Sequence, residues 1–151
     1  MEDSSSLTVS VVIPAYNVEK YVQDAVESAL NQTYPLQEIV CVDDGSTDET
    51  LDVLRKLESQ HPEQIQVLTG PNRGACAARN RGMSVATGEY IQFLDADDML
   101  LPEKVGRDVA VLEEDRESLL FGSFEGFEDG VKVYESDTFV SEDPWVCLAR
   151  Q

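Results

Sequence analysis

The sequence predicts an α/β fold in which helices flank a mostly parallel central sheet. Short apolar runs rich in β-branched residues alternate with segments whose apolar residues have helical spacing, an alternation typical of strand–helix–strand units. The first of these runs carries no charge, as is usual in strands that are covered on both faces. Polar residues follow the ends of the predicted strands, where parallel sheets bind ligands. Together these observations favour a doubly wound parallel sheet.

The first strand and helix are predicted from a sharp change of pattern at Pro14. A strand is expected over residues 8–14, because this run is β-branched and nearly continuous in apolar character. Asn17 is the predicted N-cap of a helix over 18–30, where apolar residues recur every three or four positions. A second buried strand is predicted over 39–42, directly before two aspartates.

The middle of the chain continues the alternation. Ser46 and Glu49 have the spacing of a capping box, and the helix predicted after them has an apolar stripe made of Leu51, Leu54 and Leu57. A third strand is expected over 65–68, a helix rich in small residues over 75–86, and a fourth buried strand over 90–94.

The pattern changes after one further helix. That helix is predicted over 102–115, with Pro102 in its first turn at position N1. Two strands over 118–127 and 131–134, separated by a turn sequence, predict a short β-hairpin. Residues 136–151 are acidic and weakly patterned.

Composition limits the classes of partner. The chain has 151 residues, enough for one domain with a real core, and 30 acidic against 11 basic residues, for a net charge of −19. This charge excludes a nucleic acid bound through a basic surface, and it makes a phosphate-bearing ligand unfavourable unless a metal supplies positive charge. The same acidity is typical of proteins kept soluble at high salt, which we hold as a hypothesis.

The cellular location is predicted from the cysteines and from the N-terminal residues. Three cysteines lack metal-ligand spacing, and Cys41 lies in an apolar run that predicts a buried, structural side chain. Residues 1–6 lack the pattern of a signal peptide, and no apolar run has the length that a bilayer requires. We therefore expect a cytoplasmic protein.

The most informative stretch is the acidic sequence after the fourth predicted strand. Asp95, Asp97 and Asp98 fall within four positions, and like charges this close repel one another unless a cation separates them. Mg²⁺ or Mn²⁺ would suit carboxylate oxygens and would keep positions open for phosphates. The alternative is an acidic turn in which Asp98 caps the following helix.

Four polar sets are expected along one edge of the sheet. Asp43 or Asp44 could accept a hydrogen bond from a base N–H or from ribose hydroxyls, and Tyr16 could flank a base. Arg79 could meet phosphate or anchor an acidic residue, and a metal on Asp97 would bridge two phosphates. The sequence has neither a dinucleotide-binding glycine motif after the first strand nor a P-loop.

Four motifs follow one another along residues 7–105: Val9-Ser10-Val11-Val12-Ile13-Pro14-Ala15-Tyr16-Asn17, Val42-Asp43-Asp44-Gly45-Ser46-Thr47-Asp48, Asn72-Arg73-Gly74 with Ala78-Arg79-Asn80, and Thr87 through Asp98. With these motifs in this order, the sequence resembles family 2 glycosyltransferases of the Rossmann-like GT-A fold. The resemblance implies a nucleotide-sugar donor, most often a UDP-sugar, bound with Mg²⁺ or Mn²⁺. It also implies a hexosyl- or N-acetylhexosaminyltransferase that inverts the anomeric centre by direct displacement.

The resemblance also implies the site. Pro14 and the residues after it would hold the nucleoside together with Asp44, Asp95 would face the ribose or a metal-bound water, and Asp97 would ligate the metal. The nucleotide-sugar-binding residues would be Pro14, Ala15, Tyr16, Asn17, Glu19, Asp43, Asp44, Arg79, Asp95 and Ala96, and the metal residues would be Asp95 and Asp97.

On this reading the donor-binding domain covers residues 7–115, after a disordered tail at 1–6. Residues 116–151 would begin an acceptor side that is truncated. The general base that such a reaction needs is expected beyond Gln151, and Glu142-Asp143 is a weaker candidate.

The acceptor is expected to be a glycan, a lipid-linked molecule or another hydroxyl compound, which could place the protein at the inner face of a membrane. A homodimer is left open. The alternative functions are a nucleotide-sugar-binding module without turnover, a phosphoacceptor receiver domain and a sugar-phosphate nucleotidyltransferase. The receiver domain is disfavoured because the first strand ends in Pro-Ala-Tyr-Asn, and the nucleotidyltransferase is disfavoured because no glycine-rich, arginine-containing loop follows that strand.

Overall fold

The computed structural model describes residues 6–120, 125–128 and 131–135. The chain divides into two units, Met1–Glu113 and Glu114–Gln151, and each is described by itself. The first unit contains the parallel sheet with its helices, and the second contains a hairpin.

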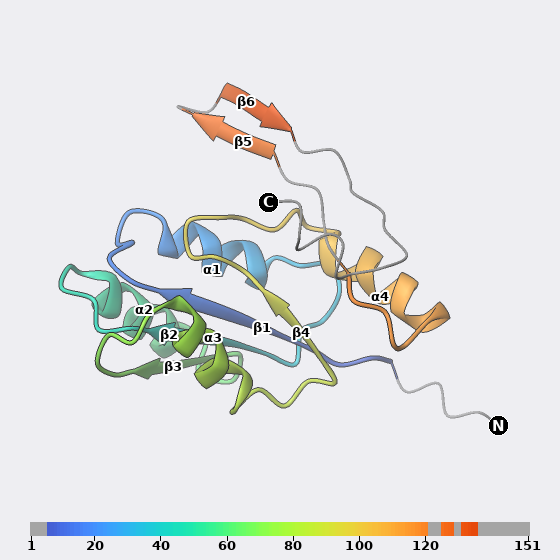
Figure 1. Cartoon of the computed structure of the whole chain (residues 1–151), viewed down its shortest axis with the longest axis horizontal. Helices are drawn as coiled ribbons and strands as arrows, with labels where there is room; N and C mark the ends of the chain where they lie inside the picture. Colours follow the sequence, from blue (N-terminus) through green and yellow to red (C-terminus); the bar gives the residue numbers. More distant parts are fainter. Residues whose placement is uncertain (1–5, 121–124, 129–130, 136–151) are drawn as a thin grey trace. The chain divides into compact units, whose positions relative to one another are not determined.

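The sheet of the first unit has four parallel strands: β1 (Val9–Ala15), β2 (Glu38–Asp43), β3 (Ile65–Thr69) and β4 (Tyr90–Phe93). Their order is β3-β2-β1-β4, so the chain moves outward from β1 to β3 and then crosses back to place β4 on the other side of β1 (Figure 1). The predicted parallel α/β fold is confirmed. The strand order reverses between β1 and β4, and such a switch point is where doubly wound sheets bind ligands.

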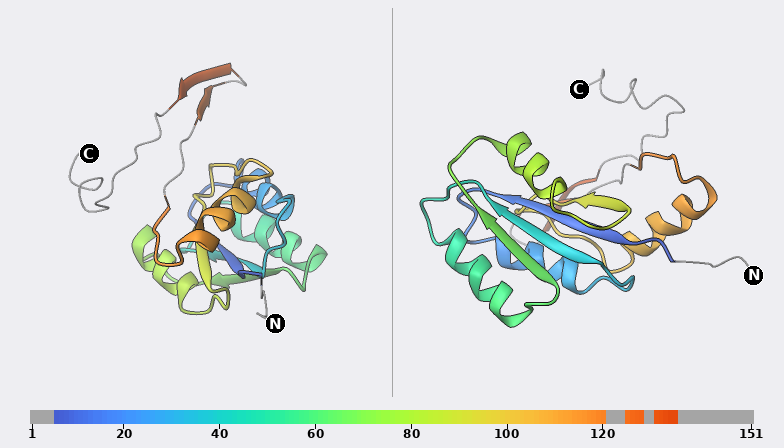
Figure 2. Two further views of the ribbon diagram at one scale, coloured as in Figure 1. Left: turned by 90° about the vertical axis from the view of Figure 1, so that its right-hand side faces the viewer. Right: turned by 90° about the horizontal axis from the view of Figure 1, so that it is seen from below.

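Helices cover both faces of the sheet (Figure 2). Helices α1 (Val22–Leu30) and α2 (Thr50–Gln60) lie against one face, and α3 (Ala75–Met83) lies against the other. Helix α4 (Lys104–Glu114) follows β4, and its Val105, Val109 and Leu112 are buried.

The side chains of β1 alternate between these two faces. Val11 and Ile13 join the larger core with α1 and α2, whereas Val12 packs in a second core with Ala78 of α3. Helix α3 approaches closely because Gly82 faces β1, where a Cβ would lie 2.4 Å from a Val12 methyl carbon. Every residue of β1 is buried, as the sequence predicted for a strand covered on both faces.

Two predicted helix starts are wrong. The first helix begins at Val22 and not after Asn17, which has a φ of 51° and does not cap the helix. The second begins at Thr50, and no side-chain capping bond is present, so Ser46 and Glu49 do not form a capping box. The Asn17 and Ser46 side chains instead accept hydrogen bonds from distant backbone groups: Asn17 from the Thr47 N–H, and Ser46 from the Asn17 N–H.

Two further predictions differ in detail. Pro102 lies in the turn before α4, which begins two residues later, so it is not at N1. Strand β4 was expected to be buried, but its residues are partly exposed and Phe93 retains 39% of its accessible surface. The reason is its position at the edge of the described sheet.

The hairpin of the second unit is confirmed. Strands β5 (Glu125–Glu128) and β6 (Val131–Glu135) pair antiparallel, with an irregularity between Gly126 and Phe127. Residues 118–120 of the first predicted strand have no strand structure, and its residues 121–124 lie outside the described residues. Residues 129 and 130 of the predicted turn, and the acidic stretch 136–151, lie outside the described residues.

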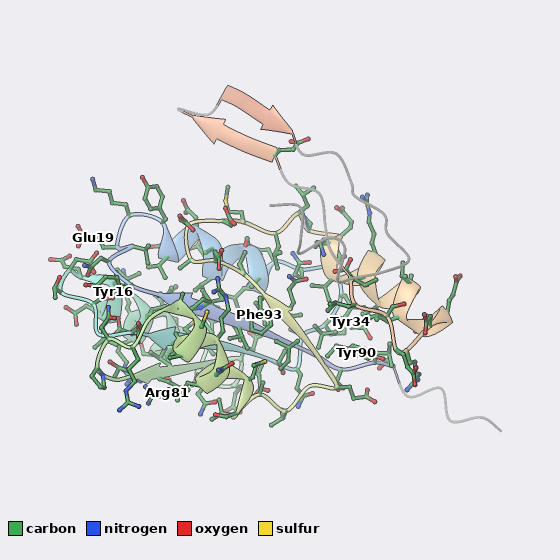
Figure 3. All side chains as sticks on the ribbon, viewed as in Figure 1. Tyr16, Glu19, Tyr34, Arg81, Tyr90 and Phe93 are labelled. Atoms are coloured by element: carbon green, nitrogen blue, oxygen red, sulfur yellow. The ribbon has the colours of Figure 1, made fainter. Side chains whose placement is uncertain are left out.

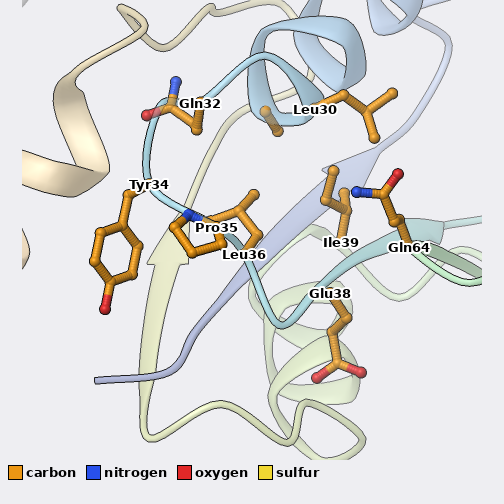
Figure 4. Close-up of a pocket in the computed structure, with 9 residues that line it drawn as sticks. Leu30, Gln32, Tyr34, Pro35, Leu36, Glu38, Ile39 and Gln64 are labelled. Carbon is orange, nitrogen blue, oxygen red and sulfur yellow. The ribbon is translucent and has the colours of Figure 1, made fainter. Parts of the chain in front are cut away.

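Glu38 joins three segments at the amino ends of the strands. Its Oε1 accepts hydrogen bonds from the Ser10 hydroxyl at 2.8 Å, the Thr87 N–H at 2.6 Å and the Thr87 hydroxyl at 2.8 Å. It also lines a small cavity of about 130 Å³ together with Tyr34, Leu36 and Gln64 (Figure 4). This cavity lies at the end of the sheet opposite the polar strand ends.

We expect Glu38→Gln to lower the free energy of unfolding at pH 7 by about 1 kcal/mol, because a neutral acceptor replaces a charged one. Burial acts to raise the pKa of Glu38, but the hydrogen bonds from Thr87 and Ser10 outweigh it and hold the pKa below the ordinary value of 4.5. A lowered pKa stabilises the fold above pH 4.5, and this contribution is lost as the pH falls through the lower, folded-state value. The difference between the two proteins should therefore shrink in acid.

Urea unfolding at neutral and acidic pH measures this difference. Glu63→Gln, at an exposed glutamate, makes the same chemical change and is the control. A difference between Glu38→Gln and the parent protein that stays constant from neutral pH to below the lowered pKa would contradict the expectation.

Candidate functional site

The carboxyl ends of the four strands meet along one edge of the sheet. Ala15 at the end of β1 pairs with Asp43 at the end of β2, and Asp43 pairs with Thr69 at the end of β3. Figure 3 shows Tyr16 and Glu19 at this end of the molecule, with Tyr34 and Tyr90 at the other. The polar sets predicted at the strand ends therefore share one edge.

Asp43 is the last residue of β2, next to the end of β3, and is buried, with 1% of its surface exposed. Its Oδ1 accepts the Ser46 N–H at 3.2 Å, and its Oδ2 accepts the Thr69 hydroxyl at 2.8 Å. Both oxygens thus hold protein groups, and Asp43 ties the start of the β2–α2 loop to the end of β3.

Asp44 ties the ends of β1 and β2 to the β3–α3 loop. Its N–H donates to the Ala15 carbonyl at 2.9 Å, and its carboxylate accepts the N–H groups of Arg73 at 2.9 Å and Gly74 at 2.7 Å. The next residue, Gly45, has a φ of +76°, and a Cβ there would lie 2.8 Å from the Asn72 nitrogen. Only glycine fits this close approach of two loops.

A cavity of about 270 Å³ lies beside Asp44. Arg73 and Arg81 line it, together with Thr69 and small residues of α3. The Arg81 guanidinium donates to the Thr69 carbonyl at 2.7 Å. In a chain with 11 basic residues, two arginines at one cavity make it a place where an anionic or carbonyl-bearing group would be favoured.

The end of β1 carries an exposed aromatic ring. Pro14 and Ala15 are buried within the strand, whereas Tyr16 is 47% exposed. Asn17 then adopts a left-handed conformation, and its N–H donates to the Ser46 hydroxyl at 3.1 Å. Tyr16 is therefore presented to solvent from the rigid end of a buried strand.

Beyond β4, the acidic stretch lies against an arginine of α3. The Arg79 guanidinium donates to Asp95 Oδ1 at 2.5 Å, and both side chains remain accessible to solvent. Ala96 is buried, while Asp97 and Asp98 are exposed. Partial burial, followed by the charges of Asp97 and Asp95, raises the pKa of Asp98 above its ordinary value. The negative charge here is dense enough that a bound cation would relieve it.

The donor chemistry of this stretch fits a hard divalent ion. Carboxylate oxygens are the ligands that Mg²⁺ and Mn²⁺ prefer. Within the described residues, no three histidine, cysteine or acidic side chains converge to hold a metal. Asp95 and Asp97 are the carboxylates of this stretch that could hold such an ion.

The structure brings the predicted residues together in two groups. Tyr16, Asn17 and Glu19 lie in a loop that is bonded to the segment after Asp44, and Arg79 is paired with Asp95. The weaker general-base candidate, Glu142-Asp143, lies outside the described residues. The sequence did not predict that side chains after Asp44 accept the backbone N–H groups of residues 17–19; these side chains are Ser46, Asp48 and Thr50. It also did not predict that Arg73 and Arg81 line a cavity. The run Ser46-Thr47-Asp48 carried a usable signal, but it was interpreted as a helix cap.

No helix in the described ranges combines the length and apolar character needed to cross a membrane.

The sequence matches a family model described as "Glycosyl transferase family 2" over residues 10–147. An uncharacterized glycosyltransferase of Nostoc sp. is 44% identical over 107 residues, which cover 71% of this chain and 33% of the relative.

Solved structures are also similar. A crystal structure of S. aureus TarS 1–349 in complex with UDP is similar, with a TM-score of 0.65 and 32% sequence identity. The match covers 73% of this chain and 33% of the TarS chain. A mannosyltransferase from Pyrobaculum calidifontis in complex with GDP-Man and Mn²⁺ has a TM-score of 0.62 and 29% sequence identity. The match covers 72% of this chain and 32% of the mannosyltransferase chain. The chain thus spans about a third of the length of these proteins.

Proposed function

The chain belongs to glycosyl transferase family 2, and from that premise we propose that it binds a UDP-sugar with Mg²⁺ or Mn²⁺ for inverting transfer of a hexosyl or N-acetylhexosaminyl group to a hydroxyl acceptor. The observation that carries the proposal is the linked row of polar strand ends at the switch point between β1 and β4. Solved relatives hold UDP or GDP-Man, which supports a nucleoside diphosphate as the common ligand.

We assign the nucleoside to the ends of β1 and β2. Tyr16 would flank the base, and the Asp44 carboxylate would accept a base N–H with lone pairs not used by Arg73 and Gly74. Uracil has such an N–H between two carbonyl groups, and an arginine of the neighbouring cavity could donate to one of them. Cytosine lacks this N–H and presents an acceptor there, so a carboxylate would repel it. Asp43 would contribute by holding the strand ends.

We assign the diphosphate to the acidic stretch after β4. Asp97 would ligate the metal, and Asp95 would face the ribose or a metal-bound water while it remains close to Arg79. When bound, a divalent ion there would stabilise the negative charge of the departing diphosphate. Arg79 would balance the charge of Asp95, leaving Asp97 as the principal ligand.

Calorimetric titration of the chain with UDP, GDP and CDP tests the proposal. We expect UDP to bind at least about tenfold more tightly with Mn²⁺ than without it, and at least about tenfold more tightly than CDP, as a lost charge-assisted hydrogen bond would require. Equal affinity for UDP and CDP, or indifference to Mn²⁺, would contradict the assignment. Release of sugar from a UDP-sugar by the chain then separates a transferase from a module that only binds.

A further inference from the structure

We propose that residues 46–50 are a positioning segment for the β1–α1 loop, and that Asn17 acts in donor binding through this segment without touching the donor. The hydrogen bonds between the two loops are called the loop clamp below. The inference rests on the proposed function, because it concerns how the nucleoside site is held.

The first half of the loop clamp runs from the β1–α1 loop to the β2–α2 loop. The backbone N–H groups of three consecutive residues donate to side chains of the positioning segment: Asn17 to Ser46 Oγ at 3.1 Å, Val18 to Thr50 Oγ1 at 2.9 Å, and Glu19 to Asp48 Oδ2 at 3.2 Å. Thr50 is fully buried, so this half is anchored in the core. The backbone of the β1–α1 loop is therefore held by side chains about 30 residues away.

The second half runs in the opposite direction. The Thr47 N–H donates to Asn17 Oδ1 at 2.8 Å, and the Glu49 N–H donates to Glu19 Oε2 at 2.9 Å. In the described part of the chain, the loop clamp thus has three backbone-to-side-chain bonds in one direction and two in the other. Such reciprocity holds each loop relative to the other, because either loop can move only by breaking hydrogen bonds that both loops donate.

Asn17 also carries an unusual backbone conformation. Its φ of 51° is positive, which among the described residues no other non-glycine shares. Asparagine tolerates this region better than most residues, but it stays there only when the surroundings hold it. The loop clamp supplies those surroundings from both the N–H and the side chain of the residue.

The loop clamp also affects Tyr16, the residue before Asn17. Tyr16 stands between Ala15, whose carbonyl accepts the Asp44 N–H, and Asn17, which the loop clamp holds. The backbone that carries the Tyr16 side chain is therefore held on both sides. A base that enters beside Asp44 would meet a tyrosine already in place, and binding would not have to order the loop.

The chemistry of Asn17 separates positioning from direct contact. Its side-chain oxygen already accepts the Thr47 N–H, so a direct contact with the donor would use the amide nitrogen. Aspartate keeps an acceptor oxygen and tolerates a positive φ, but it has no N–H to donate. Asn17→Asp should therefore restore what Asn17→Ala removes only if Asn17 acts by positioning.

The experiment compares UDP binding in Mn²⁺ for the parent chain, Asn17→Ala and Asn17→Asp, at high salt to screen the added charge. We expect UDP affinity about tenfold weaker for Asn17→Ala and within about twofold of the parent for Asn17→Asp. Hydrogen exchange without donor should show the Thr47 amide exposed in Asn17→Ala and protected in Asn17→Asp. Gln23→Ala removes an exposed amide hydrogen bond on α1 and should change neither result.

A second pair of variants avoids a change of charge and serves if Asn17→Ala is unstable. Ser46→Ala removes the acceptor of the Asn17 N–H, and Ser46→Thr returns a hydroxyl to it. We expect weakened UDP binding for the first and recovery for the second. Asn17→Asp as weak as Asn17→Ala, with Ser46→Thr no better than Ser46→Ala, would overturn the inference, as would full affinity in both alanine variants. Failure of the parent chain to bind UDP would instead refute the proposed function.

Discussion

Replacing Asp97 by asparagine is expected to weaken UDP binding in the presence of Mn²⁺ by about 100-fold or more, since loss even of outer-shell partners of a metal commonly costs 10–100-fold. Asp97 is an exposed carboxylate with no ion pair among the described residues, whereas Asp95 is already paired with Arg79. An amide oxygen is a weaker ligand for a hard cation and brings no charge to it. Binding of UDP without metal should change little, so the variant should lose its response to Mn²⁺.

The same substitution should leave the fold intact. Surface changes away from a packed contact usually alter the free energy of unfolding by no more than about 0.5 kcal/mol. Calorimetric titration with and without Mn²⁺, together with urea unfolding, measures both quantities. Asp52→Asn removes one exposed carboxylate on α2 and controls for the change in net charge. A variant at Asp97 that keeps the parent's affinity and its response to Mn²⁺ would show that the metal assignment is mistaken.

The sheet could be predicted because its strands are almost wholly apolar. β1 is buried along its full length, and a short, β-branched run that is apolar almost throughout is typical of a strand covered on both faces. The exposure of β4 could not be predicted in the same way. A short apolar run at the edge of a sheet has the same composition as one at its centre, and only the strand order tells them apart.

The starts of the first two helices were predicted wrongly for a different reason. Asn17 and Ser46 are residue types that cap helices, and a local pattern has no means of showing that their partners lie in another loop. The competing bonds join residues about 30 positions apart, which are brought together only once β1 and β2 have paired. Tertiary contact decided the local structure at these two points.

The candidate site was predicted in outline by the rule that ligands bind beyond the carboxyl ends of parallel strands. The different surroundings of Asp43 and Asp44 needed the structure, because two neighbouring aspartates are equivalent in a sequence pattern. Asp43 is the last residue of β2, and its carboxylate meets Thr69 of β3, whereas Asp44 follows the strand and its carboxylate meets the β3–α3 loop. The sequence also left Arg79 between phosphate and an acidic residue, and the structure pairs it with Asp95.

The second large effect is expected at Asp44, where stability and donor binding depend on one carboxylate. Asp44→Asn should lower the free energy of unfolding by about 2 kcal/mol, because hydrogen bonds to a charged acceptor contribute about 1.5–3 kcal/mol. Asparagine can accept only one of the two N–H groups of Arg73 and Gly74, and its NH₂ would face the other. UDP affinity should fall at least about tenfold with the loss of the charged acceptor for the base.

Urea unfolding and UDP titration on the same preparation separate the two roles of Asp44. Asp24→Asn, at an exposed aspartate of α1, is the matched control and should change neither quantity. Added Mn²⁺ should raise UDP affinity in Asp44→Asn by the same factor as in the parent, because we assign the metal to the end of β4 and the base to the end of β2. If Asp44→Asn instead removed the response to Mn²⁺, the base and the diphosphate would not occupy the separate strand ends to which we assign them. Parent-like stability would show that the loop after β3 does not depend on this carboxylate.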